Sequence, residues 1–124
     1  MKAMNSALRV AFDRELGRAE QMIAVGELDG AFAHLERAHV IGQMFVWPHA
    51  RSHWLMCRVE MQRRRGAAVF GQVMRIILGM IGSAIGIVPV GNTGGTNISM
   101  FRRLPIDPEL QKIIEGGSSS ATKE

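Results

Sequence analysis

The stretch LERAHVIGQMFVWPHARSH (residues 35–53) decides the fold. It contains Glu36-x-x-His39 and, after a short connection, His49-x-x-x-His53, so that three of the four histidines of the chain lie here. Residues three or four apart lie on one face of an α-helix. Pro48 is expected at the first position of the second helix, where a proline fits. The pattern therefore predicts an antiparallel helical hairpin with two pairs of polar side chains facing each other.

Apolar spacing extends the helical pattern on both sides of this hairpin. Residues 6–25 form an amphipathic helix that Asn5 or Ser6 can cap, and Gly26 suits its C-terminal turn. The helices of the hairpin are expected from Leu28 to about residue 43 and from Pro48 to at least the arginines at 63–65. Helical spacing resumes over 67–80, so the third helix is either long or broken at Gly66. A short helix over 108–115 follows. The predicted fold is an all-α small helical bundle with an irregular Gly-rich C-terminal segment.

The chain is short enough for one domain, which we expect over residues 1–115. The polar tail GGSSSATKE, residues 116–124, is expected to be disordered. Charged residues interrupt the N-terminal 20 residues before an apolar run can form, so no signal peptide or anchor is predicted there. Cys57 is the only cysteine, which rules out a disulfide within the chain. These features favour a cytoplasmic location.

The hairpin is our candidate metal site, with Glu36, His39, His49 and His53 as ligands. On antiparallel helices His39 and His53 lie at similar distances from the connection and can share one ion. Imidazole and carboxylate ligands suit a divalent transition metal, namely Fe, Zn, Cu or Mn. Further ligands are conceivable in Met56, Cys57 and Glu60, whereas His34 is expected to point elsewhere.

Only one Glu-x-x-His pair is present, so a mononuclear site is favoured over a di-iron centre. The sequence leaves open whether such a site would serve catalysis, sensing or metal handling. The alternative is a metal-free protein-interaction module, in which the histidines are ordinary polar residues of a helix interface. In that case Glu36 would pair with Arg37 or Arg51, and His39 would bind a buried carbonyl group.

Three further segments have features found in binding sites. The apolar run Ile76–Val90 contains a small-residue motif, Gly82 to Gly86, and is a candidate homodimer face; membrane contact is the less favoured alternative. The loop GNTGG (residues 91–95) is expected to be a structural turn rather than an anion-binding nest. The arginines at 63–65, 102 and 103 lack the aromatic residues and motifs of nucleic-acid-binding domains, so no specific nucleic acid is expected.

Two resemblances add to this interpretation. The spacing of Gly26, Ala31, Leu35, Ala38, Trp54 and Gly66 is similar to that of a tetratricopeptide-repeat hairpin, although only about one repeat is visible. A second resemblance, to a small bacterial family of unknown function, covers nearly the whole chain. It is carried by LERAH, Gly42-Gln43, His49 with His53, Gly71-Gln72 with Arg75, PVGNTGG and Leu104-Pro105-Ile106. That family implies a single domain and no particular chemistry. Leu104 departs from the methionine expected at its position.

Overall fold

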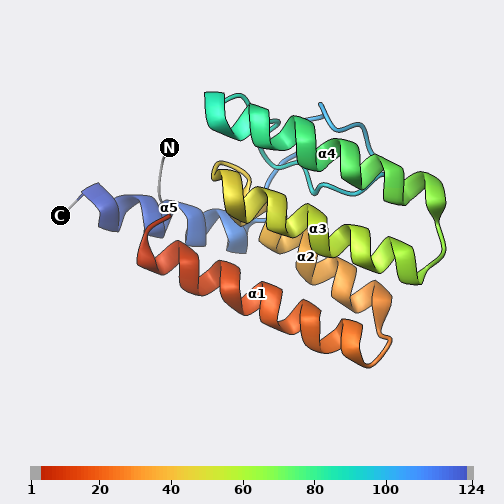
Figure 1. Ribbon diagram of the computed structural model, residues 1–124. Helices are drawn as coiled ribbons and strands as arrows, with labels where there is room; N and C mark the ends of the chain where they lie inside the picture. Colours follow the sequence, from red (N-terminus) through yellow and green to blue (C-terminus); the bar gives the residue numbers. More distant parts are fainter. Residues whose placement is uncertain (1–3, 123–124) are drawn as a thin grey trace.

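The computed structural model describes residues 4–122, with their side chains through residue 116, and contains five helices and no strand in that range. The helices are α1 (Ser6–Ala24), α2 (Leu28–Gly42), α3 (Val46–Gln62), α4 (Gly66–Ile85) and α5 (Pro108–Thr122). Helix α1 packs beside α2, α2 beside α3 and α3 beside α4, whereas α5 packs against α1 and α2 (Figure 1). The predicted all-α bundle is therefore confirmed.

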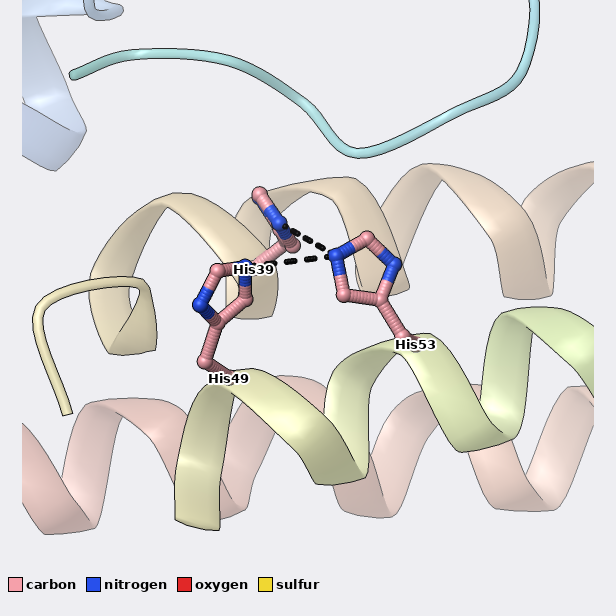
Figure 2. Close-up of side chains that lie close together, drawn as sticks. All are labelled: His39, His49 and His53. Atoms are coloured by element: carbon pink, nitrogen blue, oxygen red, sulfur yellow. Dashed lines mark hydrogen bonds between the residues drawn. The ribbon is translucent and has the colours of Figure 1, made fainter. Parts of the chain in front are cut away.

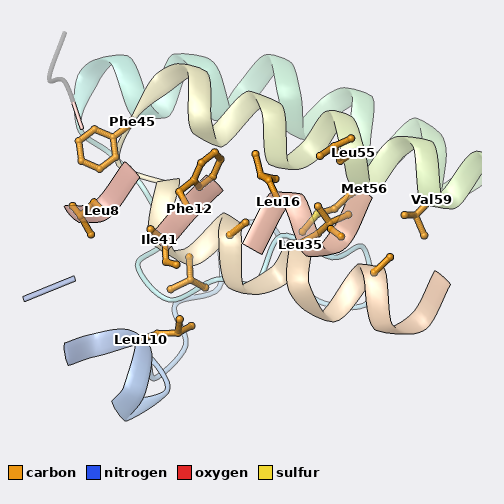
Figure 3. Close-up of a cluster of buried hydrophobic side chains, with 14 of the residues drawn as sticks. Leu8, Phe12, Leu16, Leu35, Ile41, Phe45, Leu55, Met56, Val59 and Leu110 are labelled. Atoms are coloured by element: carbon orange, nitrogen blue, oxygen red, sulfur yellow. The ribbon is translucent and has the colours of Figure 1, made fainter. Parts of the chain in front are cut away.

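The hydrophobic core lies between α1, α2 and α3, and α5 closes one end of it (Figure 3). In α1 the buried apolar side chains recur at helical spacing and are Leu8, Phe12, Leu16, Ala19 and Ile23. They meet Leu35 of α2 and the apolar side chains of α3. Because the core occupies one side of the α2–α3 hairpin, the other side is left to face α4 and the segment that follows it.

Turn residues explain where the helices begin and end. Asn5 caps α1, and its side-chain oxygen accepts a hydrogen bond from the Leu8 amide at 3.0 Å. Gly26 adopts a φ of +79° between α1 and α2, as the sequence predicts. After α3 the chain reverses through three arginines, with Arg64 at a φ of +58°. Hence α4 is a separate helix that runs back along α3 (Figure 1).

Two helix boundaries differ from the sequence-based expectation. Helix α3 begins at Val46, so Pro48 is its third residue rather than its first. A proline is tolerated there because the first amides of a helix have no carbonyl partner within it. Helix α5 continues to Thr122, beyond the expected end at residue 115, since serine and alanine accept helical backbone angles. Of the tail predicted to be disordered, residues 123 and 124 lie outside the described range.

Helix α4 has an unusual distribution of side chains. Its two buried residues, Gln72 and Ser83, are polar, whereas Phe70, Ile77 and Ile81 are 67%, 51% and 55% exposed. It is also the one helix within residues 4–122 that is long and apolar enough to cross a membrane by length and composition. The polar side of α4 faces the hairpin, and its apolar side faces outward.

The small-residue motif at the end of α4 is used within the chain. A Cβ atom on Gly82 would lie 2.6 Å from the carbonyl oxygen of Ile87, and Gly86 ends the helix with a φ of +78°. These glycines therefore allow the chain to turn tightly out of α4 into the irregular segment that leads to α5.

Candidate metal centre

Three histidines converge between the hairpin and α4. His39 comes from α2, and His49 and His53 come from successive turns of α3 (Figure 2). The Nε2 atom of His53 lies 3.0 Å from Nε2 of His39 and 3.2 Å from Nε2 of His49. Candidate ligand atoms of all three lie within 4.8 Å of one another. Each side chain is at most 5% exposed, so the group is shielded from bulk water.

The other ring nitrogens of His39 and His53 each meet an oxygen that can only accept a hydrogen bond. His39 Nδ1 lies 2.7 Å from the backbone carbonyl oxygen of Asn92, and a carbonyl cannot donate. His53 Nδ1 lies 2.7 Å from Oε1 of Gln72. The orientation of that amide is set because its Nε2 donates to the carbonyl of Gly94 at 3.1 Å. Both histidines therefore carry their ring hydrogen on Nδ1.

His49 is held in the same way by a serine. Its Nδ1 atom lies 2.6 Å from Oγ of Ser83. The hydroxyl of Ser83 has one hydrogen, and it donates that hydrogen to the carbonyl of Gln43 at 2.8 Å. Oγ is then left to accept from His49, so this ring also carries its hydrogen on Nδ1.

As a result, three Nε2 lone pairs point at one another. In these tautomers neither of the two short contacts has a hydrogen to share, although both are at hydrogen-bond distance (Figure 2). A cation is the partner that would satisfy all three nitrogens together. Three nitrogens bound to one tetrahedral zinc ion at about 2.0–2.1 Å would be about 3.3 Å apart. The distances of 3.0 and 3.2 Å from Nε2 of His53 to the other two are close to this value.

Burial keeps these imidazoles neutral. It lowers the pKa of His49 to about 4 and that of His53 to about 3, and it lowers the pKa of His39 well below the usual range. The backbone at Gly79 opposes part of this effect for His49, and Gln72 does so for His53. A neutral imidazole is the form that binds a metal, so the ligands are ready at neutral pH.

Glu36, the fourth predicted ligand, is not brought to this group. It lines a separate polar pocket with Glu60 and Arg63. Burial raises the pKa of Glu36, and the nearby charge of Arg63 opposes that shift. Three residues along a helix correspond to about 300° of rotation, so Glu36 and His39 share a face only approximately. Glu36 therefore lies on the side of α2 that is near Arg63, at the C-terminal end of α3.

The other residues considered as ligands also have different surroundings. Met56 belongs to the hydrophobic core, and Cys57 is a buried free thiol whose pKa is raised by burial. Glu60 accepts a hydrogen bond from Arg63 at 2.7 Å. His34 points elsewhere, as predicted, and its Nδ1 lies 2.6 Å from Glu15. The pairs suggested for Glu36 do not form either, since Arg37 contacts Glu15 and Arg51 contacts Glu20.

Sequence reasoning missed the residues that orient the histidines. They are Gln72 and Ser83 of α4 and the backbone at Asn92 and Gly94. One signal was present: Gln72 and Ser83 are polar residues in an apolar segment, and eleven residues make about three helical turns, which places both on one face. No comparable signal marked Asn92, because its carbonyl oxygen rather than its side chain contacts His39.

The GNTGG loop is a structural element of this site. The side chain of Asn92 donates to the carbonyls of Ser99 and Arg102 and accepts from the Gly94 amide, which holds the loop against His39. A Cβ atom on Gly94 would lie 2.7 Å from Cδ2 of His39, and one on Gly79 would lie 2.9 Å from Cε1 of His49. Both glycines therefore make room for the imidazole rings.

Comparison with known proteins gives a family but no activity. No curated protein and no solved structure matches the chain. These comparisons lend no support to the resemblance to tetratricopeptide repeats. The sequence does match a family described as a protein of unknown function, DUF3703, over residues 6–114. Because that match spans most of the sequence, and all of the helices that carry the three histidines and their partners, the chain belongs to the DUF3703 family.

Proposed function

We propose that the protein binds one divalent transition metal ion through Nε2 of His39, His49 and His53. The observation that carries this proposal is the set of three fixed tautomers, which leaves three converging nitrogens without a hydrogen among them. The hydrogen bonds at Nδ1 are those typically made by metal-binding histidines, whose second ring nitrogen donates to a carboxylate, carbonyl or water.

The three ligands narrow the choice of metal. Imidazole nitrogens suit zinc, copper, iron and nickel, whereas manganese prefers oxygen ligands. Because Glu36 lies elsewhere, all three protein ligands are imidazole nitrogens. This donor set disfavours manganese relative to iron, zinc and copper. We take Zn²⁺ as the leading candidate because three neutral ligands at this spacing fit tetrahedral coordination.

Three protein ligands leave a fourth coordination position, as in catalytic zinc sites. The histidines line a cavity of about 520 Å³ together with the second half of α4 and the segment after it. This opening supports a role in which a small molecule reaches the metal, in preference to a closed structural site. The cytoplasm remains the compartment that we propose.

Metal binding is tested on purified protein stripped with a chelator and then titrated with Zn²⁺ by calorimetry. Co²⁺ in a parallel titration reports tetrahedral coordination through its visible absorption. We expect one equivalent of metal per chain, lost in the His49→Ala/His53→Ala double variant. His34→Ala is the matched control, because His34 contacts Glu15 away from the site. The proposal fails if Zn²⁺, Cu²⁺, Fe²⁺ and Co²⁺ all fail to bind, or if the double variant binds as the wild type does.

A second candidate function concerns the outer face of α4. Phe70, Val73, Ile77 and Ile81 are exposed and recur at intervals of three, seven and eleven residues from the first, which is the stripe that paired helices use. Exposed apolar patches mark interaction sites. The only charged residue between 66 and 85 is Arg75, so like charges would hardly oppose self-association. We propose that this face pairs with a second copy of the chain.

Light scattering across a range of micromolar concentrations tests this pairing. A dimer that Ile77→Lys converts to a monomer supports the proposal, whereas a wild-type monomer at every concentration overturns it. A monomer that sediments with vesicles would instead assign the face to lipid.

A further inference from the structure

The cavity beside the histidines has an apolar wall and a cationic end. Its volume of about 520 Å³ lies within the roughly 300–1,000 Å³ of small-molecule sites. The wall is formed by apolar side chains of α4 and of the segment after it, including Leu78, Ile81, Ile85, Val88, Met100 and Phe101. Arg75 and Arg103 also line it. A hydrocarbon group would fit this wall, but it would leave the arginines unpaired.

Arg75 is the more deeply placed of the two arginines. Its Nη2 donates to the carbonyl of Ile98 at 2.9 Å, and its Nη1 donates to the carbonyl of Gly71 at 3.3 Å. Its Nε atom is buried without a hydrogen-bond partner. Within the described residues Arg75 forms no ion pair with a carboxylate, and burial lowers its pKa. A partly buried guanidinium with only neutral partners is costly unless an anion joins it.

The charges around the cavity all have one sign. Arg75 and Arg103 line it, and no aspartate or glutamate is among the lining residues. Arg75 lines the same cavity as His39 and His53, and its positive charge contributes to the lowered pKa of both. A divalent ion there would add two positive charges. The complete site therefore needs a negatively charged ligand.

We propose that this cavity binds an organic anion with an apolar body, such as a medium-chain carboxylate, with its acid group on Arg75. The apolar body lies along Leu78 and Val88. The further step, in which the same acid group also reaches the metal, rests on the proposed function. The contact with Arg75 does not require it.

The test uses sodium octanoate as the probe, titrated by calorimetry into both the chelator-treated and the Co²⁺-loaded protein. 1-Octanol has the same apolar body without the charge, and acetate has the charge without the body. We expect octanoate to bind about tenfold to a hundredfold tighter than octanol, the range for a hydrogen bond to a charged group. Arg75→Gln should abolish this preference and leave octanol binding unchanged. Arg58→Gln, at an exposed arginine outside the cavity, is the matched control.

The outcomes separate this inference from the metal proposal. If octanoate binds no tighter than octanol, or if Arg75→Gln binds octanoate as the wild type does, the inference is overturned even when the protein holds Co²⁺. If Co²⁺ does not bind, the metal proposal fails, and the octanoate titration of the chelator-treated protein still decides the role of Arg75. A change in the Co²⁺ absorption on adding octanoate would show that the acid group reaches the metal.

Discussion

Gln72 gives the sharpest test of how the histidines are held. The side chain is fully buried, and it connects His53 Nδ1, at 2.7 Å, to the carbonyl of Gly94, at 3.1 Å. Gln72→Leu keeps much of the volume and removes both hydrogen bonds. A buried N–H and a buried carbonyl then lose their partner, at a cost of about 1–3 kcal/mol each. We expect the metal-free variant to be less stable by about 2–6 kcal/mol, the sum of the two costs.

The same change should weaken metal binding, because His53 loses the acceptor that fixes its tautomer and ring orientation. Loss of such a partner typically costs about tenfold to a hundredfold in metal affinity. Zn²⁺ affinity is measured by competition with a chelating dye, and stability by urea unfolding of the metal-free protein. Gln21→Leu, at an exposed position in α1, controls for the loss of a helical glutamine.

A second variant at this position separates orientation from packing. Gln72→Glu keeps an oxygen acceptor for His53, replaces the donor to Gly94 by a second carboxylate oxygen and adds a negative charge. Its Zn²⁺ affinity should therefore lie closer to the wild type than that of the leucine variant. If Gln72→Leu folds and binds Zn²⁺ within about twofold of the wild type, or if both variants lose the same affinity, the reasoning about the tautomer of His53 is refuted.

Two further predictions concern the loop and pH. Gly94→Ala should lower both stability and Zn²⁺ affinity, since the new Cβ would lie 2.7 Å from His39 and Gly94 has a φ of +87°; Gly116→Ala, in open space, is the control. Burial lowers the pKa of His49 to about 4 and of His53 to about 3, so between pH 6.5 and 5 the unfolded chain binds more protons. Urea unfolding of the metal-free protein should show that stability decreases as the pH falls through this range, with a slope that approaches about 1.4 kcal/mol per pH unit for each histidine near pH 5, and a smaller slope in His53→Gln. A flat profile would contradict neutral buried imidazoles.

Local rules explain how much of the fold could be predicted. The apolar spacing in α1, the cap at Asn5 and the turn at Gly26 are short-range signals, and the structure confirms each of them. The same rules indicated that the residue pairs on α2 and α3 would face each other. The start of α3 was less predictable, because Pro48 fits each of the first positions of a helix.

The surroundings of the histidines depend on contacts between residues distant in the sequence. Asn92 is 53 residues from His39, and Ser83 is 34 residues from His49. No periodic pattern in the sequence indicates that these distant residues come into contact. Glu36 is the opposite case, because its spacing predicted a contact that does not form. Three residues separate it from His39, but its carboxylate lies in the field of Arg63 instead of beside the histidines.

The arrangement at the histidines also explains why packing alone is an incomplete account of them. For a hydrogen bond between two of these rings, one Nε2 would have to carry the hydrogen, and its Nδ1 would then become an acceptor. In His39 and His53 that Nδ1 would face a carbonyl or amide oxygen, which cannot donate. In His49 it would face Ser83, whose hydroxyl could turn toward it only by leaving the carbonyl of Gln43 without its donor, at about 1–3 kcal/mol. With neutral imidazoles, each metal-free arrangement thus leaves a buried polar group unsatisfied, and this is the reason for proposing a bound cation.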